Sequence, residues 1–241
     1  MAESNLQHLP DADFKRVLCV VAHPDDIEYG TSAAVAAWTA RGIEVHYLLL
    51  TGGEAGMQRP PEQTRVLRAA EQREASEVVG VQNLTILDHP DGVLVYSLDL
   101  RRDIARHIRQ VRPDVVVTGS WDVEFIAGLN QADHRAAGLA CVDAVRDADN
   151  TWVFPELAAD EGLEKWAVTW LLVAGDNRPT HGVDVTGRSL ECGISSLEAH
   201  AGYLEHIPGH PSPRELLTGM TAAQGQALGV PNAVLFRAFK L

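Results

Sequence analysis

The residues best suited to chemistry follow the first apolar segment of the chain. The apolar run 16–22 leads directly into His23, Pro24, Asp25 and Asp26. An imidazole and a carboxylate are ligands that suit zinc, and a second carboxylate can act as a base toward a water molecule. Pro24 restrains the turn that carries them. The alternative is an Asx turn that caps the next helix and leaves His23 merely exposed. Three functional side chains within four residues favour the metal site.

The first 150 residues alternate between strand-like and helical segments, which predicts the frame around this turn. Apolar runs predict strands at 16–22, 43–50, 84–87 and 114–118, and helical spacing of apolar residues predicts helices at 31–41, 62–79, 98–111 and 134–146. Continuously apolar strands fit burial on both faces of a sheet. We therefore expect an α/β fold, a Rossmann-like three-layer sandwich with a mostly parallel sheet. In such sheets, ligands bind outside the carboxyl ends of the strands, where His23 lies.

The residues after Asn150 have a looser pattern. They predict a strand at 166–174, an extended piece at 182–185, a helix at 190–205 and a closing strand at 233–239, with a turn-rich stretch at the prolines 208, 211 and 213. We expect a single domain over residues 1–241 with a core at about 16–205, in which the C-terminal part forms a cap or wall over the site.

Five further motifs make a family resemblance specific. The segment 22–26, followed by Ile27-Glu28 and Gly30, resembles the signature of the zinc-dependent N-acetylglucosaminyl deacetylase-like family, also called PIG-L or LmbE-like deacetylases. The family's other motifs have counterparts in order: Thr51-Gly52-Gly53-Glu54-Ala55-Gly56, Arg68-Ala69-Ala70-Glu71, Pro90-Asp91-Gly92, Asp133-His134-Arg135, and a weaker Asp184-Val185 before the helix that carries His200. The resemblance covers roughly residues 16 to 205.

The resemblance implies a role for each matching residue. His23, Asp26 and His134 would bind one zinc ion per chain, and three protein ligands leave a zinc ion an open position for catalysis. Asp25 would be the general base, and Arg68 and Asp91 would bind substrate. The position of His134 agrees, because it follows a predicted strand and begins a helix at the same sheet edge. His23 also needs a hydrogen-bond acceptor to fix its tautomer, and the sequence does not identify it.

Two departures from the family pattern concern proton transfer. Gln131 stands where many members have a His, and Ala201-Gly202 follow His200 where many have Ser-Gln. Gln has no titratable proton at neutral pH. We therefore expect Gln131 to stabilise the oxyanion, with Asp25 carrying the proton and His200 as the rival proton source.

The resemblance implies hydrolysis of the amide of an N-acetylated amino sugar or related conjugate, releasing acetate and a free amine. Family substrates include sugar lipids, thiol cofactors, chitobiose-like sugars and antibiotic intermediates, and no residue selects among them. The alternative is a catalytically silent member that binds zinc or another ligand. An unligated base beside the ligands argues against a silent member, and the changes at 131 and 201–202 argue modestly for one.

The composition argues against several other classes of protein. Lys and Arg total 20 against 33 Asp and Glu, a net charge of −13, which argues against nucleic-acid binding. Apolar runs are too short to span a bilayer, and the polar N-terminus (1–15) lacks a signal pattern. Three widely spaced cysteines predict neither disulfides nor a thiolate metal site. We expect a cytoplasmic protein with a small-molecule substrate, and the sequence leaves homo-oligomer formation open.

Overall fold

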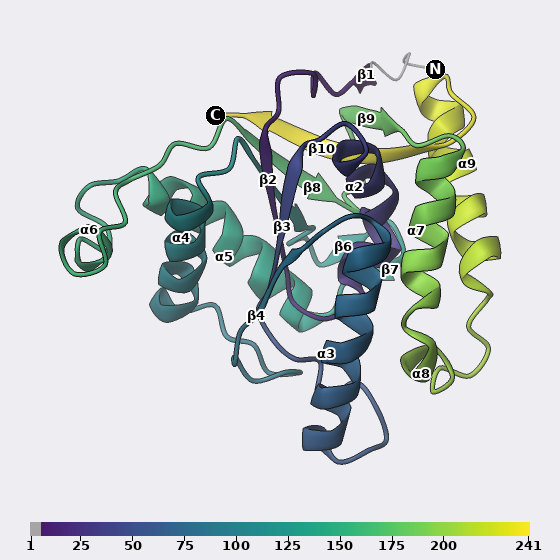
Figure 1. Cartoon of the computed structure of the whole chain (residues 1–241), viewed down its shortest axis with the longest axis horizontal. Helices are drawn as coiled ribbons and strands as arrows, with labels where there is room; N and C mark the ends of the chain where they lie inside the picture. Colours follow the sequence, from purple (N-terminus) through teal and green to yellow (C-terminus); the bar gives the residue numbers. More distant parts are fainter. Residues whose placement is uncertain (1–5) are drawn as a thin grey trace.

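The computed structural model describes residues 6–241, so the first five residues of the polar N-terminal segment lie outside the described residues. A mostly parallel sheet forms the middle layer and helices cover both of its faces (Figure 1). In spatial order its strands are β1 (Gln7–His8), β9 (His181–Asp184), β10 (Ala233–Lys240), β8 (Trp170–Ala174), β5 (Val115–Gly119), β2 (Arg16–Val21), β3 (Glu44–Leu49) and β4 (Asn83–Ile86). The expected α/β three-layer architecture is confirmed.

Strands β2 and β5 lie side by side at the centre of the sheet and run parallel. From β2 the chain continues outward through β3 and β4 on one side, whereas β5 is followed by β8 on the other. The strand order therefore reverses between β2 and β5. This is the switch point at which open α/β sheets form their binding crevice, and the turn at His23 leaves β2 there.

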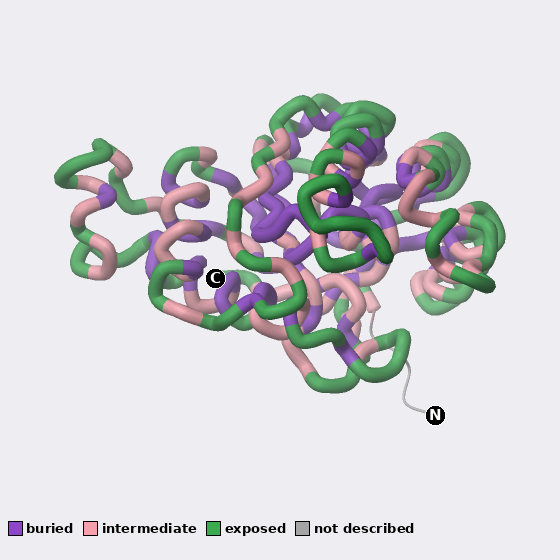
Figure 2. Tube along the Cα trace, turned by 90° about the horizontal axis from the view of Figure 1, so that it is seen from below, coloured by how far each residue is buried: buried purple, intermediate pink, exposed green. Residues whose placement is uncertain are grey.

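The two faces of β2 explain the layering. Val17 and Cys19 belong to one buried apolar cluster, and Leu18 and Val20 belong to the other. The first cluster is covered by α2 (Ser32–Thr39), and the second by α4 (Leu98–Val111) and α5 (Ala132–Ala148). Figure 2 shows buried residues concentrated in the middle of the molecule, between exposed outer turns. Burial on both faces accounts for the continuous apolar character of the strand.

Helices α1 (Asp26–Gly30) and α7 (Arg188–Glu198) contact α2. Helices α3 (Pro61–Val78) and α9 (Pro213–Leu228) pack on α7, and α8 (Ala201–Leu204) packs on α3. Helix α6 (Glu156–Ala159) lies near α4 (Figure 1). The small hairpin of β6 (Glu124–Phe125) and β7 (Gly128–Leu129) follows β5. Within residues 6–241, no helix combines the length and apolar character needed to cross a bilayer. Cys19, Cys141 and Cys192 are free thiols.

The C-terminal third differs from the sequence predictions in two places. The helix expected at 190–205 is two helices, α7 and α8, because the chain breaks at Ala199 and His200. The turn-rich stretch around the prolines gives way to the 16-residue helix α9, which the sequence pattern did not predict. Pro213 occupies its first turn, where the missing N–H costs nothing, and Ser212 with Glu215 forms a capping box. Helix α9 packs on α7, which makes it part of the expected C-terminal wall.

Candidate active site

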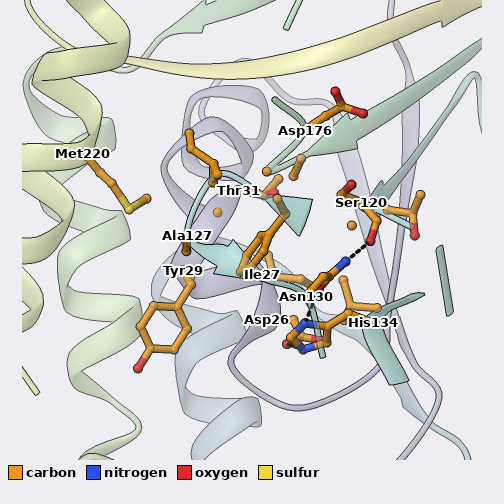
Figure 3. Close-up of a pocket in the computed structure, with 18 of the residues that line it drawn as sticks. Asp26, Ile27, Tyr29, Thr31, Ser120, Ala127, Asn130, His134, Asp176 and Met220 are labelled. Atoms are coloured by element: carbon orange, nitrogen blue, oxygen red, sulfur yellow. Dashed lines mark hydrogen bonds and ion pairs between the residues drawn. The ribbon is translucent and has the colours of Figure 1, made fainter. Parts of the chain in front are cut away.

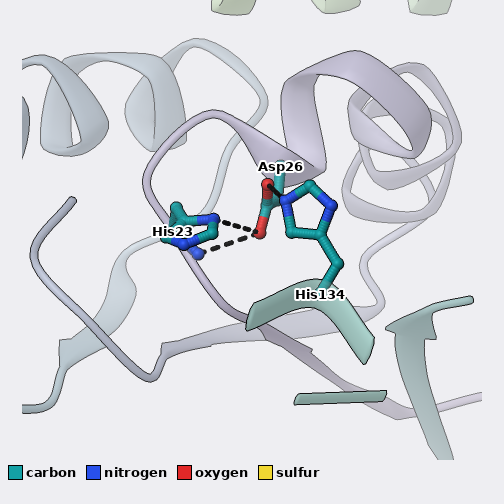
Figure 4. A group of neighbouring side chains, drawn as sticks. All are labelled: His23, Asp26 and His134. Atoms are coloured by element: carbon teal, nitrogen blue, oxygen red, sulfur yellow. Dashed lines mark hydrogen bonds and ion pairs between the residues drawn. The ribbon is translucent and has the colours of Figure 1, made fainter. Parts of the chain in front are cut away.

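The turn after β2 and the start of α5 bring the three expected metal ligands together. One donor atom each from His23, Asp26 and His134 lies within 4.8 Å of the others. The Nε2 atom of His134 is 3.0 Å from Oδ1 of Asp26, and the Nδ1 atom of His23 is 3.6 Å from Oδ2 of the same carboxylate (Figure 4). Two imidazoles and a carboxylate that converge from two elements form a donor set suited to a divalent metal such as zinc.

Carboxylates behind His23 fix which of its nitrogens faces the ligand cluster. Its Nε2 atom lies 3.1 Å from Oδ1 of Asp91 and 3.3 Å from Oδ2 of Asp133. Both carboxylates also accept backbone N–H groups, from Ala55 for Asp91 and from Gly92 and Leu94 for Asp133. They are therefore acceptors that hold the Nε2 proton and leave Nδ1 for a metal. Asp91, expected to bind substrate, is 4% exposed at its side chain and oriented toward His23.

His134 is oriented in a similar way by a residue that precedes its helix. Its Nδ1 atom lies 3.2 Å from the amide oxygen of Asn130, and the Asn130 amide group donates to the carbonyls of Ser120 and Asp122. The fixed amide favours a proton on Nδ1 and leaves Nε2 facing Asp26. The sequence did not identify Asn130, and it placed Asp133 in a motif without indicating its contact with His23. Their positions near His134, four residues before it and directly adjacent to it, were the available signal.

The charges around the cluster also favour a cation. Burial alone lowers the pKa of His23, but Asp26 and the carboxylates of Asp133 and Asp91 raise it well above the ordinary value. For His134 burial again lowers the pKa, and Asp26 raises it above the ordinary value. Burial raises the pKa of Asp26, yet the two imidazoles hold it well below its usual range. A site in which carboxylates outnumber imidazoles attracts positive charge, which a divalent metal supplies.

Asp25 lies beside the cluster in an unusual backbone conformation. Its φ of 84° is left-handed, a conformation that costs free energy in a non-glycine residue and occurs preferentially at functional sites. Its backbone N–H donates to Oε1 of Gln72 at 2.9 Å, and its Oδ2 atom is 2.9 Å from Nη2 of Arg68. Helix α3 therefore holds both the backbone and the carboxylate of Asp25, because Arg68 and Gln72 lie one turn apart on one face.

Arg68 is enclosed by protein. It is 2% exposed, donates to the carbonyl oxygens of Pro24 and Gly53, and lies over the Tyr203 ring at 3.9 Å. The glycine-rich loop makes room for it, because a Cβ on Gly53 would lie 2.6 Å from the guanidinium. Gly53 also has a φ of 65°. The contacts of Arg68 are thus with Asp25 and its turn, and the expected substrate contact of Arg68 stays a prediction.

Gln131, expected to stabilise the oxyanion, and His200, expected as the rival proton source, make different contacts. Gln131 is the N-cap of α5, and its amide oxygen accepts from the backbone N–H groups of Asp133 and His134. His200 is fully buried behind the turn, with Nε2 3.6 Å from Oε2 of Glu28. Burial lowers the pKa of His200, but Glu28 and Asp25 raise it above the ordinary value. His200 is therefore a buried partner of Glu28, and its catalytic role stays a prediction.

A cavity of about 680 Å³ begins at the ligand cluster. Asp26 and His134 line one end of it, and Tyr29 and Met220 lie toward the other end (Figure 3). The loop before α9 and α9 itself contribute to the wall through His210, Pro211 and Leu216. The C-terminal wall over the site that the sequence predicted is thus present.

Comparison with known proteins shows which family the chain belongs to. Residues 18–145 match the family model described as PIG-L, GlcNAc-PI de-N-acetylase. The chain belongs to the PIG-L family. It is similar to the diacetylchitobiose deacetylase of Thermococcus kodakarensis, with 33% identity over 139 residues, which are 56% of this chain and 51% of that protein. The matched part therefore spans about half the length of that relative.

A second relative matches over more of its length. The 1D-myo-inositol 2-acetamido-2-deoxy-α-D-glucopyranoside deacetylase of Kineococcus radiotolerans is 30% identical over 247 aligned residues, which cover 78% of this chain and 68% of that protein. The solved structure of N,N'-diacetylchitobiose deacetylase from Pyrococcus horikoshii, in complex with its inhibitor MPG, shares the fold. The TM-score is 0.85 at 23% identity, with 96% of this chain and 86% of that chain covered.

Proposed function

We propose that this PIG-L protein is a metal-dependent hydrolase that removes an acetyl (acyl) group from the amide nitrogen of an N-acetylated amino sugar or a related conjugate. The observation that carries the proposal is the convergence of His23, Asp26 and His134 beside the unligated carboxylate of Asp25. The relatives named as deacetylases of acetamido sugars support the substrate class. We further propose zinc, one ion per chain, because His and Asp ligands in an open three-residue set are typical of catalytic zinc.

A divalent metal held by these three residues would supply a Lewis acid for the amide carbonyl and lower the pKa of water toward neutrality. Asp25 then acts as general base and takes a proton from the attacking water. The new bond joins the water oxygen to the carbonyl carbon, and the carbon–nitrogen bond breaks. Asp25 returns its proton to the leaving nitrogen. The products are acetate and a free amine.

Neighbouring residues prepare Asp25 for this role. Burial raises the pKa of Asp25 to about 6, even though the positive charge of Arg68 lowers it. A base with a pKa near neutrality can both accept and return a proton at working pH. Arg68 holds the carboxylate in place, and Asp91 and Asp133 hold His23. We propose that Gln131 assists through its amide N–H₂ group, since only its oxygen is used by the helix cap.

The test is an assay of amine release from a panel of N-acetylated sugars. The panel contains N-acetylglucosamine, N,N'-diacetylchitobiose and an N-acetylglucosaminyl inositol, each incubated with zinc-loaded protein and with chelator-treated protein. We expect amine and acetate in equal amounts from at least one substrate, and loss of both on chelation. Zinc-loaded protein that binds these sugars and releases no amine would instead support the silent binding protein.

A further inference from the structure

The cavity beside the ligand cluster is much larger than an acetyl group. Its volume is about 680 Å³, whereas a methyl group takes up roughly the 30 Å³ of one water molecule. Sites for drug-sized ligands span about 300–1,000 Å³. Because Asp26 and His134 form one end, a substrate bound at the ligand cluster has direct access to this space. An acetyl methyl would leave nearly all of it unfilled.

The walls of the cavity are mainly apolar. Large apolar side chains come from four elements or loops: Ile27, Phe125, Ile126, Leu216, Met220 and Leu235. Ile126, on the β6–β7 hairpin, is 56% exposed, so an apolar ligand in the cavity would remove some of its surface from water. An apolar group gains free energy on entering such a space in proportion to the area that it buries.

Several polar side chains on the walls already have partners. The carboxylate of Asp176 accepts the backbone N–H of Arg178 at 2.8 Å, and the amide oxygen of Gln224 accepts that of Leu235 at 2.7 Å. The Nε2 atom of His210 pairs with the Tyr29 hydroxyl at 2.7 Å. A sugar ring here would lose water from its hydroxyl groups and find these groups already engaged, which is unfavourable.

The position of Asp25 decides which part of an amide enters the cavity. Neither Asp25 nor Arg68 is among the described residues that line it. Asp25 lies against α3, where it contacts Arg68 and Gln72 of that helix. The leaving nitrogen must come within hydrogen-bond reach of Asp25 to receive its proton. With the carbonyl at the ligand cluster, the nitrogen would then lie on the side of Asp25 and α3. The acyl substituent would lie on the side of Asp26 and His134, where the cavity begins.

We infer that the cavity is an acyl-binding site and that the substrate carries an apolar acyl group longer than acetyl, such as a medium-length alkyl chain or a phenyl-bearing group. This inference rests on the proposed amide hydrolysis and specifies its substrate class. Binding of the acyl chain itself needs only the cavity, so a binding measurement separates the two proposals.

Gly30 offers a way to shorten the cavity. It lines the cavity at the end of α1, and its φ lies outside the left-handed region. A Cβ there would meet one neighbouring side chain, with Ala174 Cβ 3.8 Å away. The side chain of Gly30→Leu therefore starts at the cavity wall, where its Cβ has room. Gly219→Leu is the matched control, because Gly219 is an exposed helical glycine of α9 with open space around its Cβ position.

The test compares N-acetyl-, N-butanoyl- and N-hexanoylglucosamine, by kcat/KM with zinc-loaded protein and by calorimetric binding to the Asp25→Asn variant. Each added methylene should improve kcat/KM and affinity by up to about fourfold, so the hexanoyl compound should exceed the acetyl compound by about tenfold or more. Gly30→Leu should reduce this preference by about tenfold, and Gly219→Leu should keep it.

The possible outcomes distinguish failure of the acyl-site proposal from failure of the proposed hydrolysis. Hydrolysis of the acetyl compound with kcat/KM that falls from acetyl to hexanoyl would overturn the acyl site and leave the deacetylase intact. An unchanged preference in Gly30→Leu would also overturn it. Tighter binding of the hexanoyl compound that Gly30→Leu abolishes, with no hydrolysis of any compound, would support the acyl site while contradicting the proposed hydrolysis.

Discussion

Nη2 of Arg68 lies 2.9 Å from Oδ2 of Asp25, and the two side chains are only 3% and 8% exposed. A charge pair this buried interacts strongly, because little water screens it. The pair connects a helix of one layer to the turn that carries the metal ligands. We therefore propose that Arg68 acts on the reaction through Asp25, as a positioning residue.

The first prediction separates positioning by Arg68 from substrate binding. Arg68→Met should reduce kcat by about 10–10² because Asp25 loses its partner. It should also move the acid limb of the kcat/KM profile to higher pH. The guanidinium lowers the pKa of Asp25, so its removal raises that pKa, and the base is then lost at a higher pH as the pH falls. Arg68→Lys should restore part of both effects.

The measurement is kcat and KM against pH for the wild type and both variants. A large rise in KM with an unchanged pH profile would contradict the positioning role and favour direct substrate binding by Arg68.

The second prediction concerns the two histidine ligands and Asp133, whose carboxylate contacts His23. His23→Ala and His134→Ala should lose most of the zinc, which mass spectrometry of the native protein or elemental analysis measures. Asp133→Asn should keep the ligands and weaken zinc affinity by about 10–100-fold, the usual effect of removing a group that orients a ligand. His46→Ala is the control, because His46 pairs with Glu44 on β3. Unchanged zinc affinity in Asp133→Asn would show that Asp133 does not orient His23.

The third prediction divides the two roles of Gln131. Gln131→Ala should lower the free energy of unfolding by about 1 kcal/mol because helix α5 loses its cap. It should also lower kcat by up to about 10²–10³, the effect of losing one oxyanion donor. Gln131→Ser restores the cap and lacks the amide, so it should recover stability and leave kcat low. If kcat recovers together with stability, Gln131 is a helix cap alone.

The fourth prediction concerns the buried pair of His200 and Glu28. His200→Ala should lower the free energy of unfolding by about 3–5 kcal/mol, because it leaves the Glu28 carboxylate buried without its partner. Adding Glu28→Gln should recover part of this loss, since the neutral amide retains an oxygen for Gln72 and Ser196. Denaturant unfolding of the double-mutant cycle measures the coupling. Additive losses would contradict the pairing.

The sequence predicted the sheet and the ligand cluster because both depend on local patterns. Strands buried on both faces are apolar throughout, and the turn after β2 compresses its functional residues into positions 23–26. Helix α9 escaped prediction because prolines at 208, 211 and 213 indicated turns, although Ser212, Pro213 and Glu215 together form a helix start.

The sequence alone does not predict which side chains Arg68 and Asp91 contact. Arg68 contacts Asp25 only because α3 packs over the turn after β2, and Asp91 contacts His23 only because the loop after β4 returns to that edge. An Arg on a helix and an Asp before a Gly have common structural roles, so their local patterns do not distinguish an inward side chain from an exposed one. These contacts required the three-dimensional arrangement.

The most direct test of the account is the rate of amine release by zinc-loaded Asp25→Asn on the best substrate of the panel, with zinc content measured on the same sample. The account predicts about one zinc per chain and a kcat reduced by about 10²–10⁴, the range for loss of a general base. Asp26→Asn, its neighbour, should instead lose zinc affinity. A zinc-loaded Asp25→Asn variant with the wild-type rate would contradict the assignment of Asp25 as the base.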